Sequence, residues 1–268
     1  MKGRPRERLG WWGQSQRAGQ SPGGGDCPRG AAIVTVTKWA GALVAIAVAM
    51  SPGLNAAGHT VSLRAADGTT LSAALYEAGQ QAPGVVLVHM LTRTHADWNG
   101  VADALQQAGF TVLALDLRGH GDSGGSYDPS GDLSSMQLDV QAAVRLLEAR
   151  SDVAKGRIGI AGASLGANLA IIVASNIPAV RSIALLSPGL DYRGVKCEAA
   201  MRKYGTRQAL LVAASNDSYA LRSAKQLATL GTGTEVLTLE GAGHGTTMLA
   251  RDPGLAPRLV DWFKKTLL

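Results

Sequence analysis

The chain has 268 residues, of which 46% are hydrophobic and 17% charged, enough for one sizeable core and too apolar for a disordered chain. Two cysteines, Cys27 and Cys197, without histidines at ligand spacing, exclude a disulfide-stapled mini-protein and a zinc module. The net charge of +6 is concentrated in residues 1–38, with seven basic and two acidic side chains, so the remainder is nearly neutral and we expect no nucleic-acid partner.

The N-terminal leader, residues 1–57, is predicted to direct export. An uninterrupted apolar run, Trp39–Met50, follows Lys38 and ends before Ser51-Pro52-Gly53. About a dozen apolar residues are too few for a membrane span, which needs roughly 20, but they suit the apolar region of a secretory signal. We expect cleavage near Ala57, and a periplasmic or secreted protein with no stable membrane span after processing.

Two other interpretations of this apolar run stay open, an uncleaved N-terminal membrane anchor and a core helix. Asn55 occupies the third position before the expected cut, where a small residue is usual. Residues 1–30 are rich in Gly, Arg and Pro without periodicity, a composition that does not fold. One hypothesis is that they are a start-site artefact, with the signal beginning near Val34 or Val36.

Residues 58–268 are predicted to form one α/β domain. Asp67 and Gly68 predict a hairpin turn between strands at Val61–Arg64 and Thr69–Tyr76. Further strands are expected at Gly84–His89, Thr111–Asp116, Arg157–Ala161, Ser182–Leu186, Ala209–Ala214 and Glu235–Leu239. Helices are expected at Ala96–Ala108, Ser134–Arg150, Leu165–Ser175, Tyr219–Leu230 and Pro253–Leu267. This alternation predicts a doubly wound, mostly parallel sheet with an antiparallel N-terminal hairpin, whose ligands bind outside the carboxyl ends of the strands.

The motif G-x-S-x-G, residues 162–166, stands between a buried strand and a helix and is typical of a nucleophile elbow. Such a turn exposes the hydroxyl of Ser164, while side chains at Gly162 and Gly166 would collide with the neighbouring strand and helix. The helix that begins at Leu165 directs its N–H groups at developing negative charge. The alternative is that Ser164 only caps this helix.

A serine nucleophile requires a base held by a carboxylate, and the chain supplies both in the order Ser, Asp, His. Asp217 follows the strand at Ala209–Ala214, and His244 lies in the glycine-rich loop after the last strand. Asp191 is the main rival for the acid. The plainer alternatives are a turn residue at Asp217 and a surface histidine at His244.

The region from about residue 60 to 268 resembles the α/β-hydrolase superfamily. The resemblance rests on the elbow at Ser164, the placement of Asp217 and His244, and the segment Asp116–Ser123, DLRGHGDS. The resemblance implies acyl-transfer chemistry through a seryl intermediate, without cofactor or metal. In it, Ser164 attacks a carbonyl, His244 transfers the proton, and Asp217 holds the imidazole tautomer.

The resemblance also implies an oxyanion hole made of two backbone N–H groups. One belongs to Leu165, and the other lies in the loop after His89. Members usually have His-Gly there, whereas this chain has His89 followed by Met90. By position the second donor is Leu91, with Met90 as the alternative.

The connection Ser187–Gln208 is long enough for one short helix and too short for a cap domain, so an open cleft is expected. Trp98, Tyr219 and Met248 are predicted substrate contacts. Tyr127 and Tyr192 are further candidates for an apolar acyl pocket, and Arg93, His95 and Arg118 for an acidic substrate, although each of these types more often packs or faces solvent.

The function predicted from these residues is hydrolysis of a small-molecule carboxylic ester or thioester. The same three residues serve peptidases and dienelactone-type hydrolases, because fold and triad do not choose the substrate. A catalytically silent scaffold that acts as a binding protein is the alternative outside enzymes.

Overall fold

The computed structural model describes residues 58–128 and 130–268. The basic leader, the apolar run Trp39–Met50 and the expected cleavage near Ala57 lie outside the described residues, so export and the domain boundary at residue 58 stay predictions. Within the described ranges, no helix combines the length and the apolar character needed to cross a bilayer.

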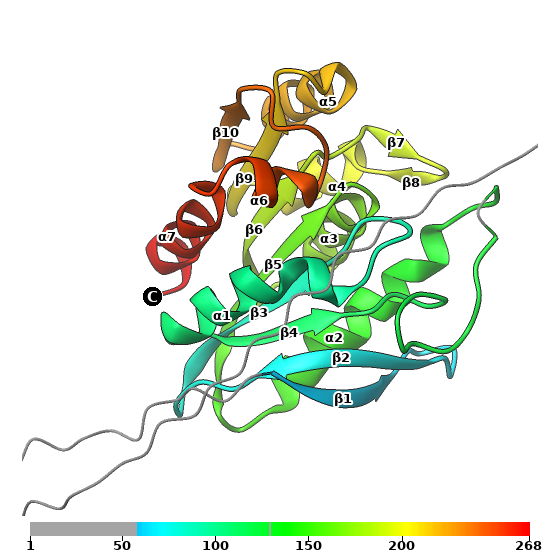
Figure 1. The fold of residues 1–268 in the computed structure, drawn as a ribbon, viewed down its shortest axis with the longest axis vertical. Coiled ribbons are helices and arrows are strands. Elements are labelled where there is room, and N and C mark those ends of the chain that lie inside the picture. The colour runs from blue at the N-terminus through cyan, green and yellow to red at the C-terminus, as the bar shows by residue number, and fades with distance from the viewer. Residues whose placement is uncertain (1–57, 129) are drawn as a thin grey trace, which may run out of the picture. The chain divides into compact units, whose positions relative to one another are not determined.

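The described residues form one eight-stranded sheet and a two-stranded hairpin (Figure 1). The sheet strands are β1 His59–Arg64, β2 Thr70–Tyr76, β3 Ala82–Val88, β4 Thr111–Leu115, β5 Val153–Ala163, β6 Val180–Leu186, β9 Gln208–Ala214 and β10 Thr234–Leu239. Their order is β1-β2-β4-β3-β5-β6-β9-β10. The first two pairings, β1 with β2 and β2 with β4, are antiparallel, and the others are parallel. The predicted fold class is therefore confirmed.

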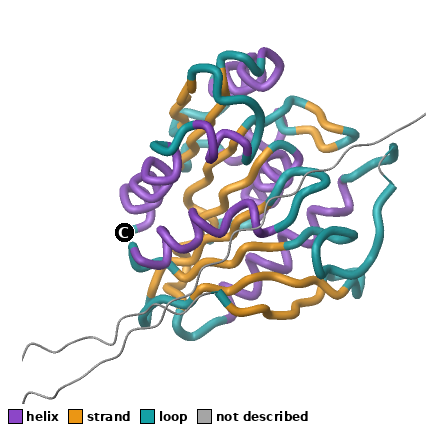
Figure 2. The backbone as a smooth tube through the Cα atoms, viewed as in Figure 1, coloured by secondary structure: helices purple, strands orange, loops and turns teal. Residues whose placement is uncertain are grey.

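Helices cover both faces of the sheet (Figures 1 and 2). They are α1 Asn99–Gln107, α2 Gln137–Ala149, α3 Leu165–Asn176, α4 Glu198–Tyr204, α5 Ser218–Ala228, α6 Thr247–Arg251 and α7 Leu255–Leu267. One buried cluster joins α2, α3, α4 and α5 to one face, and a second joins α1, α6 and α7 to the other. Strand β3 shows the consequence, since Val86 and Val88 belong to the first cluster while Val85 and Leu87 belong to the second.

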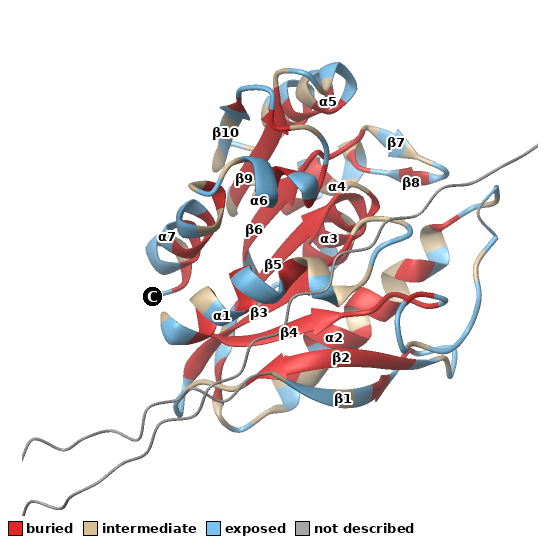
Figure 3. Cartoon of the chain, viewed as in Figure 1, coloured by how far each residue is buried: buried red, intermediate tan, exposed pale blue. Residues whose placement is uncertain are grey.

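Burial on both faces explains the uninterrupted apolar sequence of the central strands, which are buried along their length (Figure 3). Helix α3 is buried nearly all round and lacks an amphipathic pattern, whereas α7 buries one face with Leu259, Trp262 and Phe263. The core thus sits on both sides of β3, β5 and β6, and the site lies at the edge where these strands end.

The structure departs from the predicted elements in four short segments. The helix expected from Ala96 begins as a 3-10 turn, η1 His95–Trp98, and the one expected from Ser134 begins as another, η2 Ser134–Met136. The connection Ser187–Gln208 holds the expected short helix, α4, and also a hairpin of β7 Asp191–Tyr192 and β8 Val195–Lys196. Helix α6 was not expected. Elements of two to five residues are too short to show the period of a strand or a helix.

Candidate active site

Ser164 is the single residue between strand β5 and helix α3. Its backbone lies at φ 51° and ψ −114°, a conformation that L residues rarely adopt. Hydrogen bonds hold it there, because the N–H of Ser164 donates to the carbonyl of Leu186 at 2.8 Å and its own carbonyl accepts from Ala167 and Asn168. Such a strained strand-to-helix turn presents the hydroxyl outside the sheet.

The two flanking glycines are required by space. A Cβ on Gly162 would lie 2.2 Å from the carbonyl oxygen of Gly166, and a Cβ on Gly166 would lie 2.5 Å from the carbonyl oxygens of Val88 and His89. These contacts confirm the steric reason predicted for the motif. They also show that the first turn of α3 packs directly against the end of β3.

The side chains of Ser164, His244 and Asp217 form one hydrogen-bonded chain, the Ser-His-Asp array. The Oγ of Ser164 lies 2.8 Å from Nε2 of His244, and Nδ1 of His244 lies 2.6 Å from Oδ2 of Asp217. With Nδ1 protonated, the imidazole donates to the carboxylate and accepts from the hydroxyl. The rival acid, Asp191, instead accepts a hydrogen bond from the N–H of Gly194, in the β7–β8 hairpin.

The loops that carry the acid and the histidine are bound to each other. The N–H of Gly243 donates to Oδ1 of Asn216 at 3.0 Å, and the N–H of Gly245 donates to Oγ of Ser187 at 3.0 Å. Asp217 also caps helix α5 by accepting from the N–H of Ala220. The array is thus assembled from segments that follow β5, β9 and β10, at the edge where the sequence predicts a ligand site.

A pocket of about 240 Å³ opens beside the array. Its residues are Ser164, Asn168, Ser187, Gly189, Tyr192, Tyr219 and His244. Two tyrosines give it aromatic walls, and none of these seven residues is Asp or Glu. The imidazole of His244 is 48% exposed, so water reaches the array from solvent.

The structure corrects two of the three predicted substrate contacts. Trp98 and Met248 are fully buried in the cluster beneath α1, α6 and α7 and do not line this pocket. Trp98 ends η1 and Met248 lies within α6, and both side chains face the core. These elements are too short to show a helical period, so the sequence does not reveal which way their side chains point. Tyr219 does line the pocket, as does Tyr192.

The other candidate contacts are bound to protein groups. Tyr127 stacks on His120 with ring centroids 4.6 Å apart. The basic side chains suggested for an acidic substrate all have carboxylate partners, in the pairs Arg93–Asp97, His95–Asp116 and Arg118–Asp139. These basic groups thus already have carboxylate partners within the protein.

Sequence reasoning missed three of the pocket residues, Ser187, Gly189 and Asn168. The buried side chain of Asn168 donates to the carbonyl of Val195 and accepts from the N–H of Gly189, both at 2.9 Å, and so ties the β7–β8 hairpin to α3. The signal for Asn168 was available, because it is the one polar side chain among residues 165–174 and lies one turn after Ser164, on the same helix face.

The backbone N–H groups expected to form the oxyanion hole come from two adjoining segments. Leu165 begins α3, and Met90 and Leu91 follow β3, against which α3 packs at Gly166. Within the described part of the chain, no acceptor takes the N–H of Leu165, Met90 or Leu91. All three N–H groups are therefore free to donate to a ligand oxygen.

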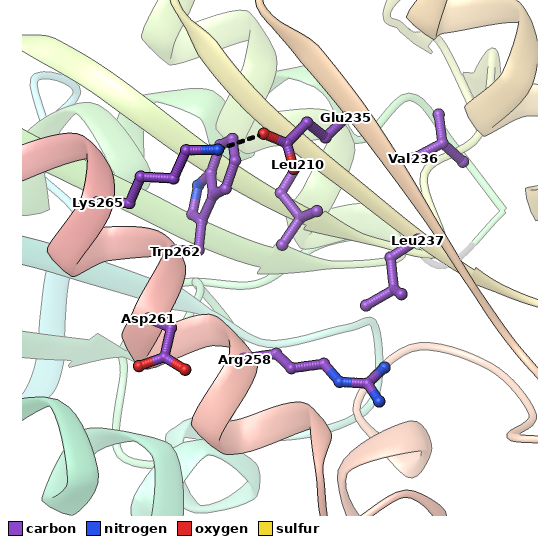
Figure 4. Close-up of a pocket in the computed structure, with 8 residues that line it drawn as sticks. All are labelled: Leu210, Glu235, Val236, Leu237, Arg258, Asp261, Trp262 and Lys265. Atoms are coloured by element: carbon purple, nitrogen blue, oxygen red, sulfur yellow. Dashed lines mark hydrogen bonds and ion pairs between the residues drawn. The ribbon is translucent and has the colours of Figure 1, made fainter.

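A second cavity, of about 320 Å³, lies between β10 and α7 (Figure 4). An ion pair between Lys265 and Glu235 crosses it at 2.6 Å beside Trp262. No member of the Ser-His-Asp array lines this cavity. In the described residues, no group of three or more His, Cys, Asp or Glu side chains is placed to hold a metal ion.

A family model described as "Serine aminopeptidase, S33" matches residues 79–226, more than half of the chain. The chain belongs to this family of α/β hydrolases. The matched region contains the elbow and Asp217, whereas His244 lies beyond it. No curated protein matches the chain in sequence.

Solved structures of α/β hydrolases share this fold. The esterase Pf2001 of Pyrococcus furiosus is 19% identical, with a TM-score of 0.66 over 79% of this chain and 93% of its own. A dienelactone hydrolase of Anabaena variabilis is 18% identical, with a TM-score of 0.67 over 79% and 98%. The carboxylesterase EstE1, cloned from a metagenomic library, is 19% identical, with a TM-score of 0.59 over 76% and 86%. At these identities the likeness shows the fold alone.

Proposed function

We propose that this hydrolase cleaves carboxylic ester or thioester bonds of small molecules through Ser164, His244 and Asp217. His244 Nε2 takes the proton of Ser164 as its Oγ bonds to the acyl carbon, and the tetrahedral intermediate then expels the alkoxide or thiolate, which receives that proton. Water, deprotonated by His244, attacks the acyl-enzyme and releases the acid and the free hydroxyl. Asp217 holds the imidazole in the required tautomer.

The observation that carries this proposal is the 2.8 Å contact between Ser164 Oγ and His244 Nε2, on a serine whose backbone is strained. A serine that only capped α3 would accept from an N–H near the start of that helix, and this side chain makes no such bond. A hydroxyl directed at an imidazole that is itself held by a carboxylate is the arrangement of an activated nucleophile.

The negative charge that develops on the carbonyl oxygen in the tetrahedral intermediate is stabilised by the free N–H groups of the oxyanion hole. Leu165 supplies one, and Leu91 or Met90 the second, at the junction of α3 and β3. Preorganised donors of this kind stabilise the tetrahedral intermediate more than the planar ground state.

The pocket favours an uncharged acyl group over a peptide with a free amino terminus. An ammonium group needs a carboxylate partner, and none of the pocket residues provides one. The two tyrosines suit a short acyl or small aromatic group, since about 240 Å³ is below the usual 300–1,000 Å³ of a drug-sized site. Among residues 58–128 and 130–268 no cap domain covers the cleft, which favours water as the acyl acceptor.

The test is a fluorophosphonate probe on the full-length protein, followed by digestion to locate the adduct, with Ser164→Ala as the control. We expect one adduct, on Ser164. A panel of short and long acyl esters, acyl thioesters, a dienelactone and aminoacyl anilides then separates the substrate classes, with turnover expected on short esters or thioesters. No labelling of the folded protein would favour the silent scaffold instead.

We also propose that the protein is exported by its N-terminal signal and cleaved near Ala57. The support is the length of the apolar run Trp39–Met50, which suits a secretory signal. Peptide mapping of the N-terminus of the protein from its native source tests this proposal. A membrane-bound product that retains the run would make it an anchor, and peptides covering Arg8 to Arg29 would refute the start-site hypothesis.

A further inference from the structure

Two buried histidines outside the Ser-His-Asp array, His89 and His120, lie next to each other, with ring centroids 5.0 Å apart. His89 directly follows the apolar strand β3, and His120 belongs to the DLRGHGDS segment, which contributes no residue to the Ser-His-Asp array. Both rings form hydrogen bonds to the loop that carries the N–H groups of Met90 and Leu91.

This loop contains a tight turn with an unusual residue at its strained position. The N–H of Arg93 donates to the carbonyl of Met90 at 3.2 Å, which closes a four-residue turn with Leu91 and Thr92 at its centre. Thr92 has φ 65°. Glycine normally occupies the third position of a turn with positive φ there, and for a β-branched residue this conformation is a genuine outlier.

His120 compensates for this strain by binding the strained residue directly. Its Nε2 accepts the N–H of Thr92 at 3.1 Å, and its Nδ1 donates to the carbonyl of Arg118 at 2.9 Å. The ring is fixed further by stacking on Tyr127, with the planes 9° apart. Both contacts require the neutral tautomer with the proton on Nδ1.

His89 makes the matching pair of bonds at the other end of the turn. Its Nδ1 donates to the carbonyl of Met90 at 2.8 Å, and its Nε2 accepts the N–H of Leu117 at 3.0 Å. Burial lowers the pKa of His89 to about 4, so the His89 ring stays neutral near pH 7. Both imidazoles therefore tie the turn to the segment that follows β4.

That segment is itself rigid. The buried carboxylate of Asp116 accepts from the backbone N–H and Nδ1 of His95 and from the N–H of Asp122. Arg118 forms a forked pair with buried Asp139. The DLRGHGDS segment thus provides a fixed platform from which His120 reaches the turn.

We propose that His120 is a positioning residue, which together with His89 holds the strained turn so that its N–H groups face Ser164 as the second half of the oxyanion hole. This inference rests on the proposed function. At Thr92, a positive φ that glycine would adopt freely depends here on an imidazole acceptor.

A double-mutant cycle on the full-length protein tests the proposal. His120→Phe keeps the ring but removes the acceptor, and we expect kcat to fall about 10- to 100-fold, below the 10²- to 10³-fold typical for complete loss of an oxyanion donor, with KM within about threefold. Thr92→Gly removes the need for the acceptor, so the His120→Phe/Thr92→Gly double variant should recover most of the lost kcat. The single variant Thr92→Gly completes the cycle.

Two further variants serve as controls. His120→Gln places an acceptor near the position of Nε2 and should retain more kcat than His120→Phe. His59→Phe, on the exposed strand β1, should leave kcat unchanged. A loss of kcat in His120→Phe that Thr92→Gly does not restore would overturn the proposal, as would an unchanged kcat in His120→Phe.

Amide hydrogen exchange keeps this inference separate from the proposed function. The Thr92 N–H should exchange at least about tenfold faster in His120→Phe than in the wild type, whatever the substrate. If the wild type neither hydrolyses any ester nor takes the fluorophosphonate, the proposed function fails, and exchange alone decides whether His120 holds the turn. Unchanged exchange at Thr92 would refute its positioning role.

Discussion

The floor and the rim of the cleft are held in different ways. The floor is the elbow at Ser164, where backbone atoms of α3 and β3 leave no room for a Cβ at Gly162 or Gly166. The rim is the β7–β8 hairpin with Tyr219, where the three atoms nearest to a Cβ on Gly189 would all belong to the Tyr219 side chain, the first at 3.2 Å. The Tyr219 side chain can move to make room for an added Cβ, whereas the packed backbone of α3 and β3 cannot.

This difference explains why the sequence predicts the reaction better than it predicts the substrate. The reactive geometry requires a few residue types at fixed spacing, and it therefore leaves a motif. The rim depends on two side chains, Asn168 and Tyr219, whose hydrogen bonds reach backbone groups of the hairpin. Many sequences can satisfy such contacts, so the rim leaves no comparable pattern.

The largest effect should come from the array itself. Ser164→Ala and His244→Ala should each lower kcat by at least about 10⁴-fold, because the members act as a unit, and Asp217→Asn should cost less than either. Steady-state kinetics of the full-length variants measures this. Asp191→Asn, in the rim, is the matched control and should stay within about twofold of wild type. A larger loss in Asp191→Asn than in Asp217→Asn would transfer the acid role to Asp191.

The second effect is a dependence of stability on pH, caused by His89 at the end of β3. Burial lowers the pKa of His89 from 6.5 to about 4, so the unfolded chain binds the proton first as pH falls. The contribution of His89 to stability is complete above pH 6.5 and declines by about 3 kcal/mol toward pH 4. Urea unfolding at pH 7, 5.5 and 4 should show this decline in wild type and a shallower one in His89→Gln. Equal slopes in the two proteins would contradict it.

A matched pair of glycine substitutions tests the contrast between floor and rim most directly. Gly166→Ala forces a Cβ against two carbonyl oxygens, and it should cost about 3 kcal/mol, the upper part of the usual range for overpacking, with loss of activity. Gly189→Ala should cost under about 1 kcal/mol and change KM more than kcat, because the Tyr219 ring can rotate away. Thermal unfolding and kinetics measure both. Similar destabilisation by the two changes would show that the rim is as rigid as the floor.

The sequence predicted the sheet, most of the helices and the three members of the array, and the reasons are physical. Buried parallel strands need unbroken apolar runs, as in β3, and the elbow at Ser164 needs its glycines. The order Ser164, Asp217, His244 placed each residue after a strand, and in the structure these strand ends meet at one edge.

The pocket was predicted less well, because its lining depends on which way single side chains point. Trp98 and Met248 are apolar residues near the right strand ends, yet both face the core. The hairpin β7–β8 has two residues in each strand and shows no alternation. The strain at Thr92 was invisible, since nothing in the sequence marks a threonine as the residue that takes a positive φ.

Removal of the Asn168 side chain, which ties the rim to α3, should have a moderate effect on stability and KM. Asn168→Ala leaves the N–H of Gly189 and the carbonyl of Val195 without their partner, which should lower the free energy of unfolding by about 1–2 kcal/mol. KM should rise more than kcat falls, and amide exchange should quicken across residues 189–195. Asn176→Ala, at the exposed end of the same helix, is the control and should change stability by less than about 0.5 kcal/mol. An equal effect of the two changes would mean that Asn168 does not anchor the hairpin.

The smallest effect should come from the outer wall of the pocket. Tyr219 is 45% exposed, and its hydroxyl donates to the carbonyl of Asp191 at 3.1 Å. Tyr219→Phe should change stability by under about 1 kcal/mol and KM by less than about threefold, since water replaces an exposed hydrogen bond at little cost. Tyr219→Ala removes the wall, so kcat/KM should shift toward longer acyl esters while kcat for a short ester stays within about threefold. An ester panel measures both variants. If neither variant alters the chain-length preference, Tyr219 does not bound the acyl group, and Tyr192 becomes the wall to vary.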